Sequence, residues 1–254
     1  MSFLNVKDAV ASGETLVFGH RGASFYAPMN TLPAFELALQ QGAAGIELDV
    51  RLTQDKQMVI IHDADVNHTT NGEGQVSQLT FDQIRALDAG AWKDEKFRGV
   101  QIPTLDEVFD LVGGKFLINV EIKAEEVRSD GVEALVADSI RRHGLADSVF
   151  VSSFNPLTLR RFRPLFPEVA LGFLHAEDTP FFLPPLLTGF QHEARHPHHE
   201  QIDARYMKWA KAHGYAVNTW TVNDPERAIT LKNWGVNAII TDKPDVILNA
   251  LQGR

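Results

Sequence analysis

Cysteine is absent from the 254-residue sequence. A disulfide framework and a thiolate nucleophile are therefore both excluded, and because the absence agrees with a reducing compartment, a cytoplasmic location is predicted. The chain also lacks an apolar run long enough to span a bilayer, and its first residues do not combine a basic region with an apolar one. We therefore expect neither an integral membrane segment nor a secretion signal.

Positive charge is scarce. Lys and Arg total 24 against 33 Asp and Glu, so the formal net charge is -9. Nucleic-acid binding is not expected, because it requires clustered Lys and Arg, and the sequence contains no such cluster. An anionic substrate would need a metal ion or a local cationic patch to overcome this background. The sequence carries no signal for an oligomeric state.

Short β-branched apolar runs alternate with amphipathic segments along the whole chain. This alternation is typical of βαβ units around a parallel sheet. The length suits an α/β barrel, and no proline-containing linker divides the chain. The sequence therefore predicts a (β/α)8 TIM barrel that forms one domain over residues 1–254.

Eight segments are predicted as strands: Thr15–His20, Gly45–Arg51, Met58–His62, Lys115–Lys123, Ser148–Phe154, Val169–His175, Ala216–Val222 and Ala238–Thr241. A further short strand at Ala194–Pro197 is an alternative, in which case two of the others share a position. Helices are predicted at Thr31–Gln41, Leu105–Leu111, Val132–His143, Ala204–His213, Pro225–Asn233 and Pro244–Leu251. The expected N-caps are Asn30, Thr104, Asn155, Asn223 and Asp242.

Two stretches interrupt this alternation. Residues 63–103, after the third predicted strand, are too long for a simple loop and contain a predicted helix at Thr80–Leu87, so we interpret them as a small insertion over one mouth of the barrel. Residues 176–200 are rich in Pro, Phe and His, and we expect loop and short helix there.

Acidic side chains occur near the ends of two predicted strands. Glu47 and Asp49 are separated by one residue, so they point to the same side of their strand, and Glu121 occupies a similar place on the fourth strand. Carboxylates gathered on an apolar strand repel each other and lose hydration unless a cation lies between them. Oxygen ligands without cysteine favour a hard cation, Mg2+ or Ca2+, as the cofactor. An ion network with Arg or Lys is the alternative.

Basic side chains occur at the ends of the same group of strands. His20 and Arg21 end the first predicted strand, His62 ends the third, and Lys123 follows Glu121 by two residues. Imidazoles titrate near neutral pH and suit proton transfer in both directions. Arg21 and Lys123 provide the positive charge that a phosphate oxygen requires. In a barrel these ends line one shared mouth, so we interpret the whole set as catalytic rather than as surface charge.

Two aromatic side chains follow later strands, Phe154 and Trp220. They either line the side of the pocket that receives the organic part of a substrate or belong to the core. Neither supplies the additional base that a barrel enzyme catalysing enolisation would need, which disfavours that alternative. A non-catalytic phosphate-binding barrel is also disfavoured, because both histidines are present.

Eleven short motifs occur in an order and spacing that resemble those of the glycerophosphodiester phosphodiesterases. They are HRG at 20–22, PMNT at 28–31, ELDV at 47–50, HD at 62–63, TTNGEG at 69–74, LDAGAW at 87–92, IPTLDEV at 102–108, EIK at 121–123, SSF at 152–154, TWTVND at 219–224 and IITDKP at 239–244. The resemblance spans nearly the whole chain. It implies a barrel in which the insertion is the segment that marks this family among related phosphodiesterases.

The resemblance also implies a substrate and a reaction. Glycerophosphodiesters such as glycerophosphocholine or glycerophosphoethanolamine would be cut to glycerol 3-phosphate and an alcohol, with a related activity on lysophospholipids as the alternative. His20 is assigned as base and His62 as acid, with the roles reversed in a second step. The family usually has Glu at position 29, where this chain has Met29. We expect Asn30 and Thr31 still to cap the following helix, and activity to persist with altered metal affinity or substrate preference.

Overall fold

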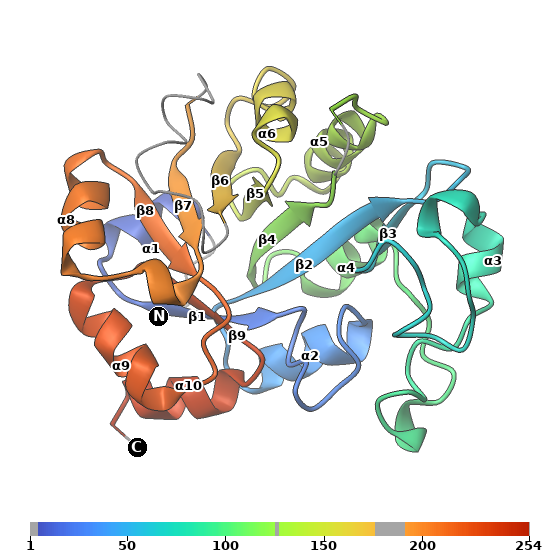
Figure 1. The fold of residues 1–254 in the computed structure, drawn as a ribbon, viewed down its shortest axis with the longest axis horizontal. Helices are drawn as coiled ribbons and strands as arrows, with labels where there is room; N and C mark the ends of the chain where they lie inside the picture. Colours follow the sequence, from blue (N-terminus) through green and yellow to red (C-terminus); the bar gives the residue numbers. More distant parts are fainter. Residues whose placement is uncertain (1–4, 125–126, 176–190, 254) are drawn as a thin grey trace.

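The computed structural model describes residues 5–124, 127–175 and 191–253. Eight parallel strands form a closed barrel with helices between them (Figure 1). The barrel closes because the first strand pairs with both the last and the second. The strands are β1 (Leu16–His20), β2 (Gly45–Leu52), β4 (Leu117–Ile122), β5 (Val149–Ser153), β6 (Ala170–His175), β7 (Ala194–Pro197), β8 (Ala216–Thr219) and β9 (Ala238–Thr241). The predicted TIM barrel is confirmed.

Helices surround the barrel and all the predicted ones are present. They are α1 (Val6–Ala11), α2 (Leu32–Gln40), α3 (Phe81–Arg85), α4 (Leu105–Val112), α5 (Val132–His143), α6 (Pro156–Phe162), α8 (Ala204–Ala212), α9 (Pro225–Trp234) and α10 (Pro244–Leu251). The sequence did not predict α1 or α6. Among the helices that the structure describes, none combines the length and apolar composition that a bilayer span requires.

The helix caps follow the predictions only in part. Thr104 and Asn155 cap α4 and α6 as predicted. The predictions for the other three were wrong, because the caps are Thr31, Asp224 and Lys243, each one residue later. The three displaced side chains, those of Asn30, Asn223 and Asp242, instead make hydrogen bonds at the mouth of the barrel.

The third predicted strand is not part of the barrel wall. The strand β3 (Met58–Ile60) pairs antiparallel with β2 and lies at the edge of the sheet, so His62 does not end a barrel strand. The strand that completes the barrel is β7, between β6 and β8, at the alternative strand position Ala194–Pro197. Of the predicted loop and short helix at 176–200, residues 176–190 lie outside the described residues, and the 3-10 helix η3 (His199–Gln201) follows β7.

Residues 63–103 fold beside β2 and β3, on the side of the barrel away from α8 and α9 (Figure 1). They contain two 3-10 helices, η1 (Val76–Gln78) and η2 (Glu95–Phe97), as well as α3, where Thr80–Leu87 was predicted. Val59 and Ile61 pack into a small apolar cluster of this region, whereas Ile60 packs into the main core. Alternate residues of β3 therefore join the insertion to the barrel.

Apolar side chains fill the barrel interior at the amino ends of the strands, its lower end, and polar side chains lie toward the carboxyl ends, which form the mouth. Phe18 and Phe150 fill the lower interior together with alanines from four strands. Above them, the polar side chains of Glu47, Asn119 and Asn218 are buried. The outward faces of the strands pack on the helices in a separate apolar cluster. The buried polar side chains thus gather toward the carboxyl ends of the strands, where the active sites of such barrels lie.

Candidate active site

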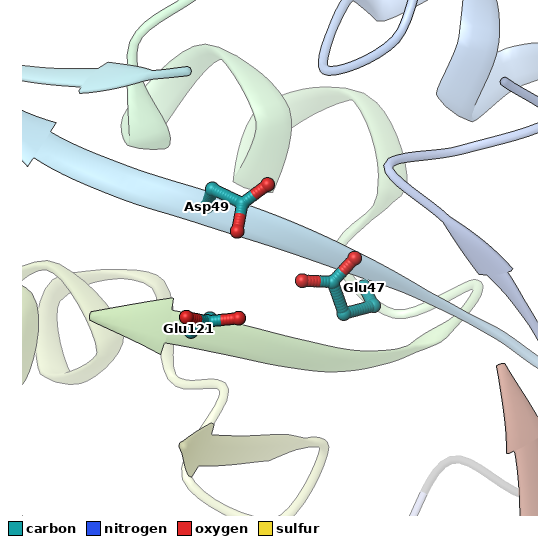
Figure 2. Close-up of side chains that lie close together, drawn as sticks. All are labelled: Glu47, Asp49 and Glu121. Carbon is teal, nitrogen blue, oxygen red and sulfur yellow. The ribbon is translucent and has the colours of Figure 1, made fainter. Parts of the chain in front are cut away.

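Three buried carboxylates face one another at the mouth of the barrel (Figure 2). Glu47 and Asp49 lie on β2, and Glu121 lies on β4 directly opposite Asp49 in the strand register. One oxygen from each group lies within 4.8 Å of the others. The two-residue spacing on β2 thus places both side chains inside the barrel, as the alternation of a strand requires.

Burial and mutual repulsion disturb the ionisation of all three groups. Burial, followed by the charges of Asp49 and Glu121, raises the pKa of Glu47 well above its usual value. Burial also raises the pKa of Glu121 to about 7, although Lys123 opposes this shift. Burial acts in the same direction on Asp49, but Lys123 and then Arg21 hold the pKa of Asp49 well below its usual range. Two of the three carboxyls therefore resist ionisation without a further positive charge.

Two cationic side chains compensate part of this charge. Lys123 Nζ lies 2.6 Å from Glu121 Oε1 and 3.1 Å from Asp49 Oδ1. Arg21 Nε lies 3.4 Å from Asp49 Oδ2, and its backbone N–H donates to Glu47 Oε2 at 3.0 Å. Three carboxylates against two cations leave one negative charge when all are ionised. The ion network expected as the alternative to a metal is thus present but does not balance the charge.

The donor set fits a hard divalent cation. Carboxylate oxygens are the ligands that Mg2+ and Ca2+ prefer, and three of them converge here. Asn119 lines the same cavity, and its buried side-chain oxygen accepts no hydrogen bond from the described residues. A further positive charge at this position would favour ionisation of Glu47 and Glu121, whose pKa values are raised.

His20 approaches the carboxylates from β1. Its Nε2 lies 4.0 Å from Glu47 Oε2, and its Nδ1 lies 2.7 Å from Asp242 Oδ1. Asp242 directly follows β9, the neighbour of β1 in the barrel. His20 lines the cavity with its side chain 17% exposed, so that Nδ1 contacts Asp242 and Nε2 lies on the side of the carboxylates.

His62 approaches from the insertion side. It follows β3 by two residues, and its Nδ1 lies 2.8 Å from Oδ1 of the adjacent Asp63. Its side chain is 35% exposed, twice as much as that of His20. Burial lowers the pKa of His62, with the charge of Asp49 opposing the shift. The two histidines therefore reach the mouth from different parts of the fold.

A cavity of about 240 Å³ brings the predicted residues together. Eight of the nine line it: His20, Arg21, Glu47, His62, Glu121, Lys123, Phe154 and Trp220. Asp49, the ninth, is buried behind Arg21 and Lys123. The apolar side chains of Leu174 and Ile240 complete the wall.

The two aromatic residues both line the cavity, and Trp220 also packs against the apolar cluster inside the barrel. Phe154 is 41% exposed, and its ring meets that of Trp220 edge to face at 5.5 Å. Lys123 Nζ lies 5.9 Å from the centre of the Phe154 ring. Trp220 Nε1 donates to the carbonyl of His196 at 2.9 Å. Of the two interpretations from sequence, the exposure of Phe154 favours the pocket wall, whereas Trp220 combines a place in the wall with a contact to the core.

Sequence reasoning missed the groups that hold the site residues. Asn30 Nδ2 donates to Asp49 Oδ2 at 2.8 Å, and Asn30 adopts a positive φ of 59°. Met29 Sδ lies 3.3 Å from Arg21 Nη1 and accepts a hydrogen bond. Asp63 and Asp242 contact the two histidines. The signal for the last two was their position, since Asp63 follows His62 and Asp242 follows a barrel strand.

The model of the glycerophosphoryl diester phosphodiesterase family matches residues 20–246. The chain belongs to this family. A glycerophosphodiester phosphodiesterase of Caldanaerobacter subterraneus is 40% identical over 94% of this chain and 98% of its own. One of Bacillus altitudinis is 35% identical over 91% and 96%. This glycerophosphoryl diester phosphodiesterase family member is therefore a phosphoric diester hydrolase, as predicted.

Solved structures agree with the family assignment. An Oleispira antarctica phosphodiesterase in complex with the product sn-glycerol-3-phosphate matches with a TM-score of 0.87 and 32% identity, covering 96% of this chain and 99% of its own. A glycerophosphodiester phosphodiesterase from Agrobacterium tumefaciens matches with a TM-score of 0.79 and 28% identity, covering 92% and 98%. The family and the barrel are thus supported by sequence and by structure.

Proposed function

We propose that this enzyme cleaves glycerophosphodiesters to glycerol 3-phosphate and a free alcohol, with the aid of one divalent cation. The observation that carries the proposal is the cavity of about 240 Å³, which combines two histidines, two cationic side chains and two of three convergent carboxylates. The family assignment and the product found in the Oleispira antarctica relative support the substrate class.

Glu47, Asp49 and Glu121 are the proposed ligands of the cation, Mg2+ or Ca2+. When bound, the cation would supply Lewis-acid stabilisation of charge on a phosphoryl oxygen. Arg21 and Lys123 are proposed to bind the remaining phosphate oxygens, since both line the cavity. The ion pairs with Asp49 would hold the side chains of Arg21 and Lys123 in place before the substrate enters.

His20 and His62 are the proposed proton carriers. His20 would remove the proton from the attacking oxygen, which is either water or the glycerol 2-hydroxyl of the substrate, and His62 would protonate the leaving alkoxide. In the second case a cyclic phosphate forms first and water opens it with the two roles reversed. Both imidazoles line the cavity, so both can reach a bound phosphodiester.

Phe154 and Trp220 are proposed to contact the organic part of the substrate. Their edge-to-face pair lines the same cavity as the carboxylates of Glu47 and Glu121. An aromatic face also suits a cationic head group such as choline. A cytoplasmic location, as the lack of cysteine indicates, would expose the enzyme to soluble phosphodiesters.

The test is release of the free alcohol from a panel of substrates, together with the phosphomonoester, which is glycerol 3-phosphate from a glycerophosphodiester and an acyl-glycerol 3-phosphate from a lysophospholipid. Glycerophosphocholine, glycerophosphoethanolamine and a lysophospholipid are each incubated with enzyme in chelator and after Mg2+ or Ca2+ is restored. We expect cation-dependent release from the two water-soluble diesters. Release only from the lysophospholipid would transfer the proposal to that substrate class. Binding of phosphate without any release would indicate a non-catalytic barrel.

A further inference from the structure

The structure points to a positioning residue behind His20. We propose that Asp242 fixes the tautomer and orientation of the His20 imidazole, with Asn223 fixing the carboxylate of Asp242 in turn. The inference rests on the proposed function, because a general base at His20 needs one ring nitrogen that carries no hydrogen and faces the substrate. It goes further by predicting which hydrogen-bond polarity the site requires.

The first observation is the contact between His20 and Asp242. His20 Nδ1 lies 2.7 Å from Asp242 Oδ1. An ionised carboxylate can only accept, so Nδ1 must carry a hydrogen. In the neutral imidazole the other nitrogen, Nε2, then holds a lone pair. Because Nε2 lies on the side of Glu47, 4.0 Å from its Oε2, the lone pair faces the cavity. This is the tautomer that a general base needs.

The second observation is that Asp242 is itself held by hydrogen bonds. Ser24 Oγ donates to its Oδ1 at 2.9 Å, and Asn223 Nδ2 donates to its Oδ2 at 2.6 Å. Burial opposes ionisation, but the hydrogen bond from His20 is the largest of the effects that lower the pKa of Asp242 below its usual value. The carboxylate therefore presents acceptors only, in one orientation.

The third observation fixes the direction of the Asn223 amide. Its Oδ1 accepts from the backbone N–H of Asp242 and from Thr241 Oγ1, both at 2.9 Å. A backbone N–H can only donate, so Oδ1 has to lie on that side. The amide cannot turn over, and its Nδ2 must donate toward the side chain at position 242.

The partner of His62 is held differently. Asp63 is the next residue in the chain, and its side chain is 38% exposed, compared with 27% for Asp242. Asp242 comes from the far end of the chain, 222 residues from His20, and is held by two other side chains. The carboxylate that contacts His20 is thus held by more hydrogen bonds than the one that contacts His62.

This polarity makes a sharp experiment available. In Asp242→Asn, the fixed Nδ2 of Asn223 requires the oxygen of the new amide, so its NH2 group turns toward His20. The imidazole must then accept at Nδ1 and carry its hydrogen on Nε2, which removes the lone pair from the cavity. We expect kcat to fall at least ~10-fold, and at most by the ~10,000-fold that accompanies a catalytic histidine in the wrong tautomer.

A second substitution should reverse the first. In the double variant Asn223→Asp with Asp242→Asn, one oxygen of the new carboxylate still accepts from Thr241 and the backbone, while the other accepts from the new amide. The amide oxygen then faces His20 again and restores hydrogen on Nδ1. We expect kcat of the double variant to exceed that of Asp242→Asn by ~10-fold or more.

The experiment measures kcat, KM and cation affinity on the Mg2+-loaded protein, together with the 15N shifts of the His20 ring, which report its tautomer. Asp245→Asn is the matched control, because its carboxylate accepts a hydrogen bond from Tyr26 and does not line the cavity. The expected result is a tautomer change and lower kcat in Asp242→Asn, recovery in the double variant, and little change in KM, cation affinity or the control.

Two outcomes would overturn the inference. One is an unchanged His20 tautomer and kcat in Asp242→Asn. The other is a folded double variant without recovery of either. If Asp242→Asn fails to fold, as judged by circular dichroism, the double variant carries the test, since it should still show hydrogen on Nδ1. Full activity of His20→Ala would instead refute the proposed role of His20 itself, which separates failure of the function from failure of the inference.

Discussion

The two halves of the barrel mouth differ in chemistry. The half built on β1, β2 and β4 places six ionisable side chains in or directly behind the cavity: His20, Arg21, Glu47, Asp49, Glu121 and Lys123. The half built on β5, β6 and β8 presents Phe154, Leu174 and Trp220 to the same cavity. Under the proposed function, the first half would bind the phosphoryl group and the second the alcohol, with His62 reaching the cavity from the segment that follows β3.

The largest effect should come from the charged half. Glu47→Gln keeps the size of the side chain but removes one of three proposed ligands. We expect loss of cation binding and at least ~1,000-fold lower activity, since a metal supplies several kcal/mol of charge stabilisation. Isothermal titration with Mg2+ and Ca2+ and product release measure the two. Glu36→Gln, on the exposed face of α2, is the control. Full turnover in excess chelator would contradict the cation's role.

The histidines come next. His20→Ala and His62→Ala should each lower kcat by ~100-fold, as typical for a lost general base or acid, with the cation still bound. A nitrophenyl diester, whose leaving group needs no protonation, should partly rescue only His62→Ala. Rescue of His20→Ala instead would exchange the two assignments. Loss of cation binding in both variants would indicate that the histidines are metal ligands and not proton carriers.

The charged half should also respond to pH without substrate. Burial raises the pKa of Glu121 from 4.5 to about 7 in the fold, so the folded state binds more protons than the unfolded one between these values. Its contribution therefore lowers stability as pH rises from about 4.5 to about 7. In chelator, Glu121→Gln should show a smaller decrease in melting temperature across this window. Wild-type cation affinity should increase across the same window, and equal pH slopes in both proteins would contradict the assignment.

The apolar half should show the smallest effect. Trp220→Ala should change the ratio of kcat/KM for glycerophosphocholine to that for an uncharged head group by ~3- to 30-fold, the range of a cation–π contact. Trp220→Phe retains a ring but loses the hydrogen bond to His196, which separates recognition from support. Equal losses for all head groups, with a lower melting temperature, would assign Trp220 to the core.

The fold was largely predictable because hydrophobic alternation and helix punctuation report local structure. They do not report strand partners, so β3 was counted in the barrel. One signal was overlooked: only residues 53–57 separate β2 from β3, and a parallel connection needs a dozen residues or more. The strand β7 was harder to predict, because Arg195, His196 and Pro197 are residue types typical of exposed loops, although all of this strand is buried.

The site residues were predictable where charge follows a strand end, since such positions converge in a parallel barrel. Their supports were not. Asn30 resembles a helix cap in sequence, yet its positive φ turns its amide toward Asp49. Asp242 likewise looks like a cap for α10, and only the closure of β9 against β1 brings it to His20. Such contacts depend on tertiary geometry and have no local signature.

The antiparallel placement of β3 has a consequence for how the enzyme loses activity on warming. His62 adjoins a region with its own small apolar cluster, which contacts the rest of the protein through β3 and through a few hydrogen bonds, such as that from Lys93 Nζ to the carbonyl of Ser24. Regions of this kind open as separate cooperative units at lower free energy than the whole protein. The barrel would then keep the proposed cation site while His62 moves away from it. Inactivation would precede the main heat-absorption peak, and amide exchange near Ile61 would report the difference.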